Sequence, residues 1–342
     1  FAAIPAASKP VSSWSTAEVA AITAGDVASL QPSHISGMST TQVNALSNAV
    51  LGALTTAQVQ ALSSKQLGSF STASVNALST TAFASLTANQ VQGLTNTQVG
   101  SLSTTNVAAL GSSQLNALKA AQITSFTTTQ VNSISTGTLS AIKGSQVAML
   151  SSAQVAAITT DRVASLTTAQ IASLTTDQIV GLITAQLASL ATDRIASLTA
   201  SQVAAIETTD IQALGTDIAN LNSATLATLT SEQLAALTTA QTAGLTSTAV
   251  KALSTAQLAA MQTADVAALS SSNIAALSSV QVQALTTAQV VGLADSQITN
   301  MNTTTLQALS VKQVAVLETS DIVSLGSTKV TSLSSTQLRA MT

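Results

Sequence analysis

The chain has 342 residues, of which 46% are hydrophobic but only 7% charged and 1% aromatic, and its net charge is -3. It contains no Cys and a single His, which excludes disulfide scaffolds and thiolate metal sites and leaves little for acid–base chemistry. The basic residues are scattered, so no nucleic-acid partner is expected, and no apolar run approaches the ~20 residues that span a membrane. We expect no catalytic residue, no metal site and no cofactor.

The first 14 residues differ from everything that follows. They form an irregular segment that includes Phe1, Ile4 and Val11 and two prolines, which disfavour a helix. The sequence therefore predicts an extended N-terminal arm over 1–14. Trp14, the last residue of this segment, is expected to close the N-terminal end of the core.

From Ser15 onward the chain repeats every eight residues. The pattern is S/T-T-A-Q-V-A-A/S-L, and it gives 41 units up to Met341, one of which, Gly215 to Leu221, has only seven residues. We number the octad positions 1 to 8 from the leading Ser or Thr. Position 8 is a large apolar residue in every unit, and position 5 is apolar in all but one, where Thr242 stands. This regularity predicts a repeat domain over 15–342.

The start of each octad carries a helix-capping signal. Ser or Thr at position 1 and Gln at position 4 have the spacing of a capping box, as in Thr167 and Gln170. The apolar residues before the cap and at position 5, such as Leu166 and Ile171, have the spacing of a hydrophobic staple. Each octad is therefore predicted to form a short capped helix.

Such short helices are unstable alone, so they must stack as a solenoid. The predicted fold is all-α: a solenoid of very short capped helices, one per octad, with two octads per coil as the simplest closed arrangement. Asp161, Asp177 and Asp193 recur every 16 residues at position 3 and favour two; three per coil stays open. A β-solenoid is also conceivable, but only 14 Gly are present for its corners and the body is Ala, Leu and Gln. The seven-residue unit is interpreted as a shortened turn that preserves the apolar register.

Two sets of residues resemble ligand sites superficially. His34 has no second His or Cys to complete a metal site, so a capping role is favoured. A stacked ladder of Asp161, Asp177 and Asp193 would offer oxygen ligands to Ca²⁺, but N-terminal helix carboxylates next to Arg162 and Arg194 are the simpler interpretation.

Units such as LTTAQIASL, LTTDQIVGL and LTSEQLAALTTAQ resemble the L-T-T-x-Q-[VI]-x-A-L arrays of very large secreted bacterial surface proteins, which are often labelled haem-utilisation or adhesion proteins. The resemblance extends over about Ser15 to Met341. It implies an extracellular or cell-surface location. It does not implicate haem, since one His and no Cys offer poor axial ligands.

These observations predict an extracellular structural protein, a subunit of a filament, sheath or surface layer. The alternative is the stalk of a giant bacterial adhesin or, less favoured, an ice- or carbohydrate-binding repeat module. The expected partner is a second copy stacked head to tail, and the exposed hydroxyls are possible sites of O-linked glycans. The expected assembly interface consists of Phe1, Ile4, Val11, Trp14, Leu338 and Met341.

Overall fold

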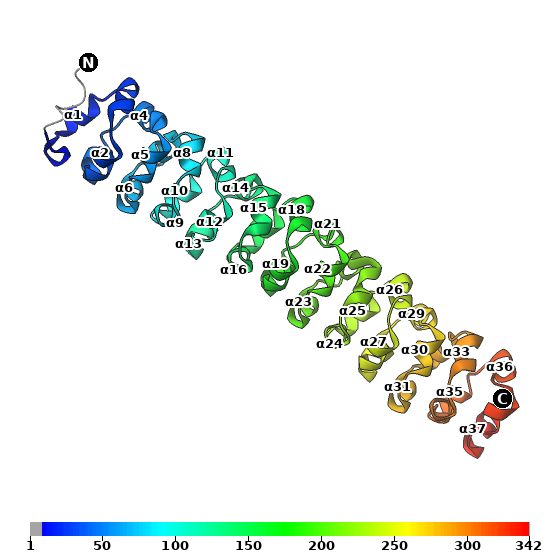
Figure 1. Ribbon diagram of the computed structural model, residues 1–342. Coiled ribbons are helices and arrows are strands. Elements are labelled where there is room, and N and C mark those ends of the chain that lie inside the picture. The colour runs from blue at the N-terminus through cyan, green and yellow to red at the C-terminus, as the bar shows by residue number, and fades with distance from the viewer. Residues whose placement is uncertain (1–8, 342) are drawn as a thin grey trace. The chain divides into compact units, whose positions relative to one another are not determined.

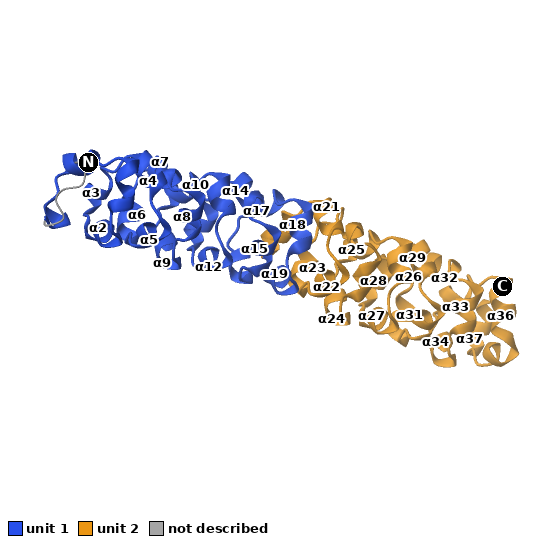
Figure 2. Cartoon of the chain, turned by 45° about the horizontal axis from the view of Figure 1, so that its top comes forward, with its two compact units in different colours: residues 1–174 blue, residues 175–342 orange. Residues whose placement is uncertain are grey.

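A computed structural model describes residues 9–341, and in this range it consists of short helices and turns without a strand (Figure 1). The chain divides into two compact units, 1–174 and 175–342, each built in the same way (Figure 2). The predicted all-α repeat solenoid is confirmed, with one short helix in nearly every octad. Within the described residues no helix is long and apolar enough to cross a membrane.

The helices of the first unit, with 3-10 helices labelled η, are η1 (Val11–Ser13), α1 (Thr16–Ala20), η2 (Ala24–Ser29), α2 (Pro32–Gly37), α3 (Thr40–Val43), α4 (Asn48–Ala53), α5 (Thr56–Gln60), α6 (Ser64–Ser69), α7 (Thr72–Ala77), α8 (Thr80–Ala84), α9 (Ala88–Gln92), α10 (Asn96–Gly100), α11 (Thr104–Ala108), α12 (Ser112–Leu115), α13 (Ala120–Thr124), α14 (Thr128–Ser133), α15 (Thr136–Ala141), α16 (Gly144–Val147), α17 (Ser152–Ala156), α18 (Thr160–Ser165) and α19 (Thr168–Ser173).

The helices of the second unit are α20 (Thr176–Val180), α21 (Thr184–Ala188), α22 (Thr192–Ala196), α23 (Ala200–Ala205), η3 (Ile211–Asn220), α24 (Ser223–Leu226), α25 (Ser231–Ala235), α26 (Thr239–Ala243), α27 (Ser247–Ala252), α28 (Thr255–Ala260), α29 (Thr263–Ala268), α30 (Ser271–Ala275), α31 (Ser279–Ala284), α32 (Thr287–Val291), α33 (Asp295–Asn300), α34 (Thr303–Gln307), α35 (Val311–Val314), α36 (Thr319–Val330) and α37 (Ser335–Ala340). Helices η3 and α36 each join two octads across a kink at a glycine, Gly215 and Gly326, with positive φ.

The predicted caps start the helices. In α19, Thr167 has extended backbone angles, and its Oγ1 accepts a hydrogen bond from the Gln170 N–H at 3.2 Å. The Gln170 Oε1 accepts from the Thr167 N–H at 2.8 Å, which completes the capping box. The same reciprocal pair recurs along both units, for example at Ser63 and Gln66 and at Thr286 and Gln289.

Three helices, not two, make one coil. Each helix packs against the third helix along the chain, as α4 does with α7 and α11 with α14 in the first unit, and α26 with α29 and α30 with α33 in the second. Neighbouring coils are therefore three octads apart, 24 residues rather than 16, and the prediction of two octads per coil is wrong. Its basis was misleading because Asp161, Asp177 and Asp193 are exposed, so their spacing reports nothing about packing.

Positions 5 and 8 form a continuous core within each unit. Ile171 and Leu174 are 0% and 4% exposed, and the equivalent residues of other octads are similarly buried. Small residues at position 7 allow the coils to approach closely, as predicted. A Cβ placed on Gly93 would lie 2.6 Å from the Cβ of Ser64, a position-2 residue one coil earlier.

The array begins before Ser15. Val11–Ser13 form a 3-10 turn, so the predicted extended arm is wrong for this stretch. The turn packs against α2, and Trp14 is buried. Val11 and Trp14 therefore occupy positions 5 and 8 of an additional, degenerate octad. Only the rest of the arm, with Phe1 and Ile4, lies outside the described residues.

The short unit preserves the apolar register, as predicted. Gly215 takes φ 54°, and the next core residues, Ile218 and Leu221, remain 0% and 4% exposed. Glycine suits this turn because positive φ is unfavourable for residues with a Cβ.

Candidate functional site

The feature that recurs throughout the molecule is a buried glutamine at position 4. Its amide has two roles: the Oε1 caps its own helix, and the Nε2 donates to backbone carbonyls four octads earlier. Gln170 is 1% exposed, and its Nε2 lies 2.7 Å from the Leu139 carbonyl oxygen and 2.8 Å from that of Ile142. One side chain thus caps the start of α19 and the end of the helix 28–31 residues before it, α15.

This arrangement solves a problem that every short helix has. The last carbonyls of a helix lack partners within the helix and must be satisfied elsewhere. These octads have no glycine cap after the helix; instead, the glutamine of a later octad donates to the carbonyls of positions 5 and 8. The same two-carbonyl contact is made by Gln58, Gln66, Gln90, Gln98, Gln154, Gln289 and Gln313, among others.

The contact adapts to the seven-residue unit. Gln233, which lies after that unit, donates to the carbonyls of Val203 and Ile206, which lie before it. The separations are 30 and 27 residues instead of 31 and 28, so the glutamine finds the same octad positions despite the missing residue. The contact is therefore specified by octads and not by a fixed number of residues.

Some octads replace the glutamine and keep the donor. Arg162 directs its Nε to the Ile134 carbonyl at 3.2 Å, and the Asn273 Nδ2 donates to the Leu245 carbonyl at 2.8 Å. At Arg162 the cap acceptor is lost, and Asn132, from an earlier coil, accepts from the Thr159 N–H instead. Long or amide side chains at position 4 thus preserve the bond between coils.

Two buried position-4 side chains within the described residues leave an atom unpaired. The Gln146 Oε1 has no partner because the Lys143 N–H donates to Asn116 instead. The Asp265 Oδ2 is also unpaired, and burial raises the pKa of Asp265. Burial likewise raises the pKa of Asp321. A carboxylate cannot donate to the carbonyls that a glutamine amide reaches, so these acids are weaker substitutes.

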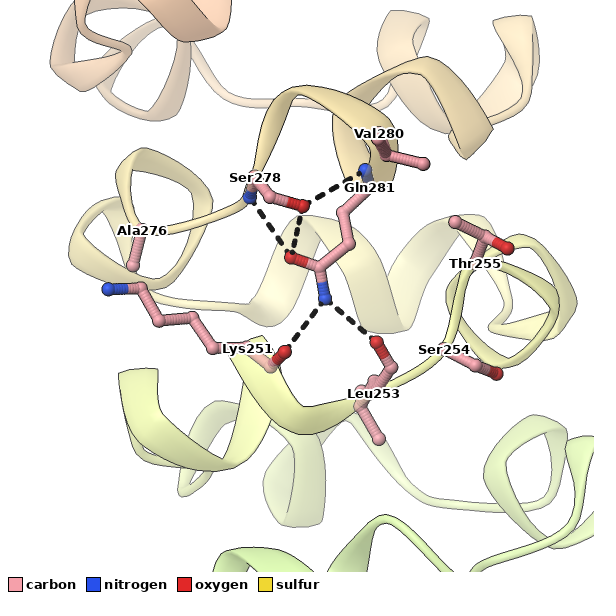
Figure 3. Close-up of a pocket in the computed structure, with 8 residues that line it drawn as sticks. All are labelled: Lys251, Leu253, Ser254, Thr255, Ala276, Ser278, Val280 and Gln281. Carbon is pink, nitrogen blue, oxygen red and sulfur yellow. Dashed lines mark hydrogen bonds between the residues drawn. The ribbon is translucent and has the colours of Figure 1, made fainter.

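An open groove lies along the glutamine contact (Figure 3). Around Gln281 it has a volume of about 440 Å³ and is lined by Lys251, Ser254, Ser278 and the exposed Val280. A second groove of about 370 Å³ beside Gln42 is lined by equivalent octad positions. The groove is thus a property of the repeat, and its lining changes with each octad's exposed residues.

The residues predicted for assembly fall into two places. Val11 and Trp14 come together, because the Gln42 Nε2 donates to both of their carbonyls, at 2.9 and 2.7 Å. Leu338 is 40% exposed and Met341 half-buried, both at the end of the last described helix, α37. Phe1 and Ile4 lie outside the described residues. Their role in assembly stays a prediction.

The other candidate residues are engaged locally. His34 completes a capping arrangement, since its Nδ1 accepts from the Gln31 N–H at 3.2 Å, and its ring lies 5.5 Å from that of Trp14. Asp193 pairs with Arg194 at 2.8 Å, and Asp161 with Arg162 at 3.6 Å. The described part of the chain contains no group of three His, Cys, Asp or Glu arranged to hold a metal ion.

The second role of glutamine was missed from the sequence, although a signal existed. Glutamate at position 4 would complete a capping box as well as glutamine does. Yet glutamate occupies this position only once, at Glu18, whereas glutamine is the rule from Gln42 onward. That preference indicates a need for a donor as well as an acceptor.

The comparisons with known proteins agree with the repeat and add no activity. Five segments match the model of the ALTTAQ repeat family: residues 19–56, 38–72, 51–80, 216–247 and 258–295. A search of curated proteins gave no match. Among solved structures, the leucine-rich repeat-containing protein LegL7 from Legionella pneumophila is 15% identical, with 72% of this chain and 79% of that one covered, but the TM-score of 0.18 carries no argument about fold. The chain is therefore similar to ALTTAQ repeat arrays over less than half of its length.

Proposed function

We propose that this chain is a structural spacer, whose role is to hold other parts of a surface or extracellular protein apart. The observation that carries the proposal is the glutamine contact between coils. The most buried polar side chains of the molecule are spent on joining each octad to its neighbours, in both units. The extracellular setting rests on the resemblance of the octads to arrays in large secreted bacterial proteins.

The repeat contact suits a spacer because it is the same at every step. Each octad contacts only nearby octads, so stability builds up locally and the number of octads can vary. The seven-residue unit supports this view, since the glutamine contacts continue across it. Length is thus the property that such an array sets most directly.

A deletion series tests this role. Removing residues 71–94, three whole octads of the first unit, is expected to shorten the particle by one coil in small-angle X-ray scattering while the helix content per residue stays unchanged. Removing 71–82, one and a half octads, serves as the control, because it breaks the octad register. Equal loss of helix in both variants, or no change of length in the first, would contradict a spacer.

A second candidate is a filament subunit, which the exposed C-terminal residues favour. Leu338 occupies a core position but is 40% exposed, whereas equivalent residues such as Leu306 are fully buried. An apolar coil face of this kind can be covered by another coil, and repeated contacts between unlike ends produce an open filament. Negative-stain electron microscopy of the purified chain distinguishes filaments from separate particles.

A further inference from the structure

The two ends of the array carry different chemistry. In the interior, glutamine at position 4 donates to an octad four places earlier. At the N-terminal end, the four octads that would donate outward have Pro10, Glu18, Asp26 and His34 at this position, and none carries an amide. Gln42 is the first position-4 residue with a partner octad inside the array, the degenerate one that contains Val11 and Trp14.

The acids of the N-terminal coil are occupied with local bonds. Glu18 accepts from Lys9 Nζ at 2.7 Å and from the Ser15 N–H at 2.7 Å, and these bonds hold the pKa of Glu18 down to about 2. Asp26 accepts from the Thr23 N–H at 2.9 Å. Both carboxylates would face carbonyl oxygens if another coil were stacked here in the register of the repeat. This coil therefore has the polar outer side of a terminal cap.

The C-terminal coil has the opposite character. Its position-8 carbonyls, those of Leu317, Leu325, Leu333 and Met341, receive no side-chain donor from the residues that the structure describes. Its apolar residues are also less covered: Ile322 and Val330 are half-buried, and Leu338 is 40% exposed. The face thus presents the same acceptors and core residues that an interior coil presents to its neighbour.

We propose that the outer face of the last four octads, residues 310–341, is a docking surface for another coil of octads that carries glutamine at position 4. The occupant follows from continuity with the contact seen throughout the array, in which a glutamine amide reaches the carbonyls of positions 5 and 8. The native N-terminal coil of a second copy is a poor occupant, because it offers Glu18 and Asp26 where donors are required. This inference names the partner for the filament candidate, and its failure leaves the spacer role untouched.

The full chain allows a direct test by exchanging the N-terminal position-4 residues. The variant P10Q/E18Q/D26Q/H34Q supplies four outward amides and keeps acceptors for the helix caps. We expect the variant to associate head to tail at least tenfold more tightly than the wild type in sedimentation velocity. The matched control P10A/E18A/D26A/H34A removes the same charges without adding donors, and it should associate no more tightly than the wild type.

A block of the opposite end completes the design. Adding Leu338→Asp to the glutamine variant should return it to the wild-type association constant, because the charge would lie in the new contact. The proposal is overturned if the folded glutamine variant stays as weakly associated as the wild type, if the alanine control associates equally well, or if Leu338→Asp has no effect.

A second experiment does not depend on the N-terminal coil. The chain is lengthened after residue 342 by a copy of residues 279–301, which supplies the position-4 residues Gln281, Gln289 and Gln297. Amide hydrogen exchange within 334–341 should slow at least tenfold. A matched extension with these three glutamines replaced by Glu should slow it less. Equal exchange with and without the glutamine extension would overturn the proposal.

Discussion

The contacts around Gln170 and Asp265 occupy the same place in the repeat but differ in completeness. Gln170 is paired at both ends: its Oε1 accepts from the Thr167 N–H, and its Nε2 donates to two carbonyls of an earlier coil. Asp265 is as deeply buried, at 2% exposed, yet one of its oxygens has no partner. The nearby Gln262 contributes a donor from the cap position instead, to the Ala235 carbonyl at 2.7 Å.

The difference shows what position 4 requires. The side chain must accept from its own cap and donate across the coil, and only an amide of sufficient length does both. A carboxylate performs the first task and fails the second. Shape and burial alone are therefore insufficient, and the hydrogen-bonding inventory of the side chain decides how well two coils are joined.

The largest effect is expected from emptying the core beside Gln170. Ile171→Ala removes a fully buried side chain and should cost about 2–5 kcal/mol. Because contacts are between near neighbours, the loss should be concentrated in adjacent coils. Hydrogen exchange measured along the chain checks this. Equal loss of protection over every coil of the first unit would contradict a locally stabilised array.

Converting the complete contact into an incomplete one should have the next largest effect. Gln170→Glu keeps the cap acceptor but leaves the carbonyls of Leu139 and Ile142 without a donor, at a cost of about 1–3 kcal/mol. Chemical denaturation of the variant and the wild type at pH 7 measures the difference. The equivalent change Gln58→Glu provides a replicate elsewhere in the same unit. Unchanged stability in both variants would show that the second role of glutamine is dispensable.

The cap hydroxyl should contribute less. Thr167→Ala removes the acceptor of the Gln170 N–H and is expected to cost about 0.5–2 kcal/mol. Thr168→Ala, one residue later, is the control, since Thr168 lies at the first position of α19 and not at its cap. Thermal unfolding of both variants tells them apart, and an equal or larger cost at Thr168 would place the cap wrongly.

Repairing the incomplete contact should give a smaller, favourable change. Asp265→Gln is expected to stabilise the second unit by about 0.5–1.5 kcal/mol at pH 7. Because burial raises the pKa of Asp265, the folded chain holds its proton more tightly than the unfolded chain. That contribution to stability is present below the ordinary pKa of 3.8 and is lost as the pH rises through the raised, folded-state pKa. The advantage of Asp265→Gln should therefore grow from pH 4 to pH 7, and an advantage independent of pH would contradict the burial argument. Asp265→Asn separates the loss of charge from the gain of a long donor.

The sequence predicted the helices well because their signals are local. The capping pairs, such as Thr167 and Gln170, and the buried positions 5 and 8 follow from spacing within one octad. The seven-residue unit was also interpreted correctly, since Ile218 and Leu221 stay buried.

The number of helices per coil was not predictable in the same way. It depends on the turn between helices and on contacts 24 or more residues apart, which no single octad records. The exposed residues Asp161, Asp177 and Asp193 gave a false rhythm of 16. The more informative clue was the preference for glutamine over glutamate, because it reflects a bond to another coil.

The most direct test of the glutamine contact is hydrogen exchange of Gln170→Ala compared with the wild type. The side chain caps two helices that are distant in sequence, so two separate segments should lose protection. One is the start of α19, at 167–171. The other is the end of α15, where the Ile142 N–H bonds to the Leu139 carbonyl that Gln170 also contacts. Loss of protection confined to 167–174, or a second affected segment 16 residues before Gln170 instead of about 28, would contradict the contact.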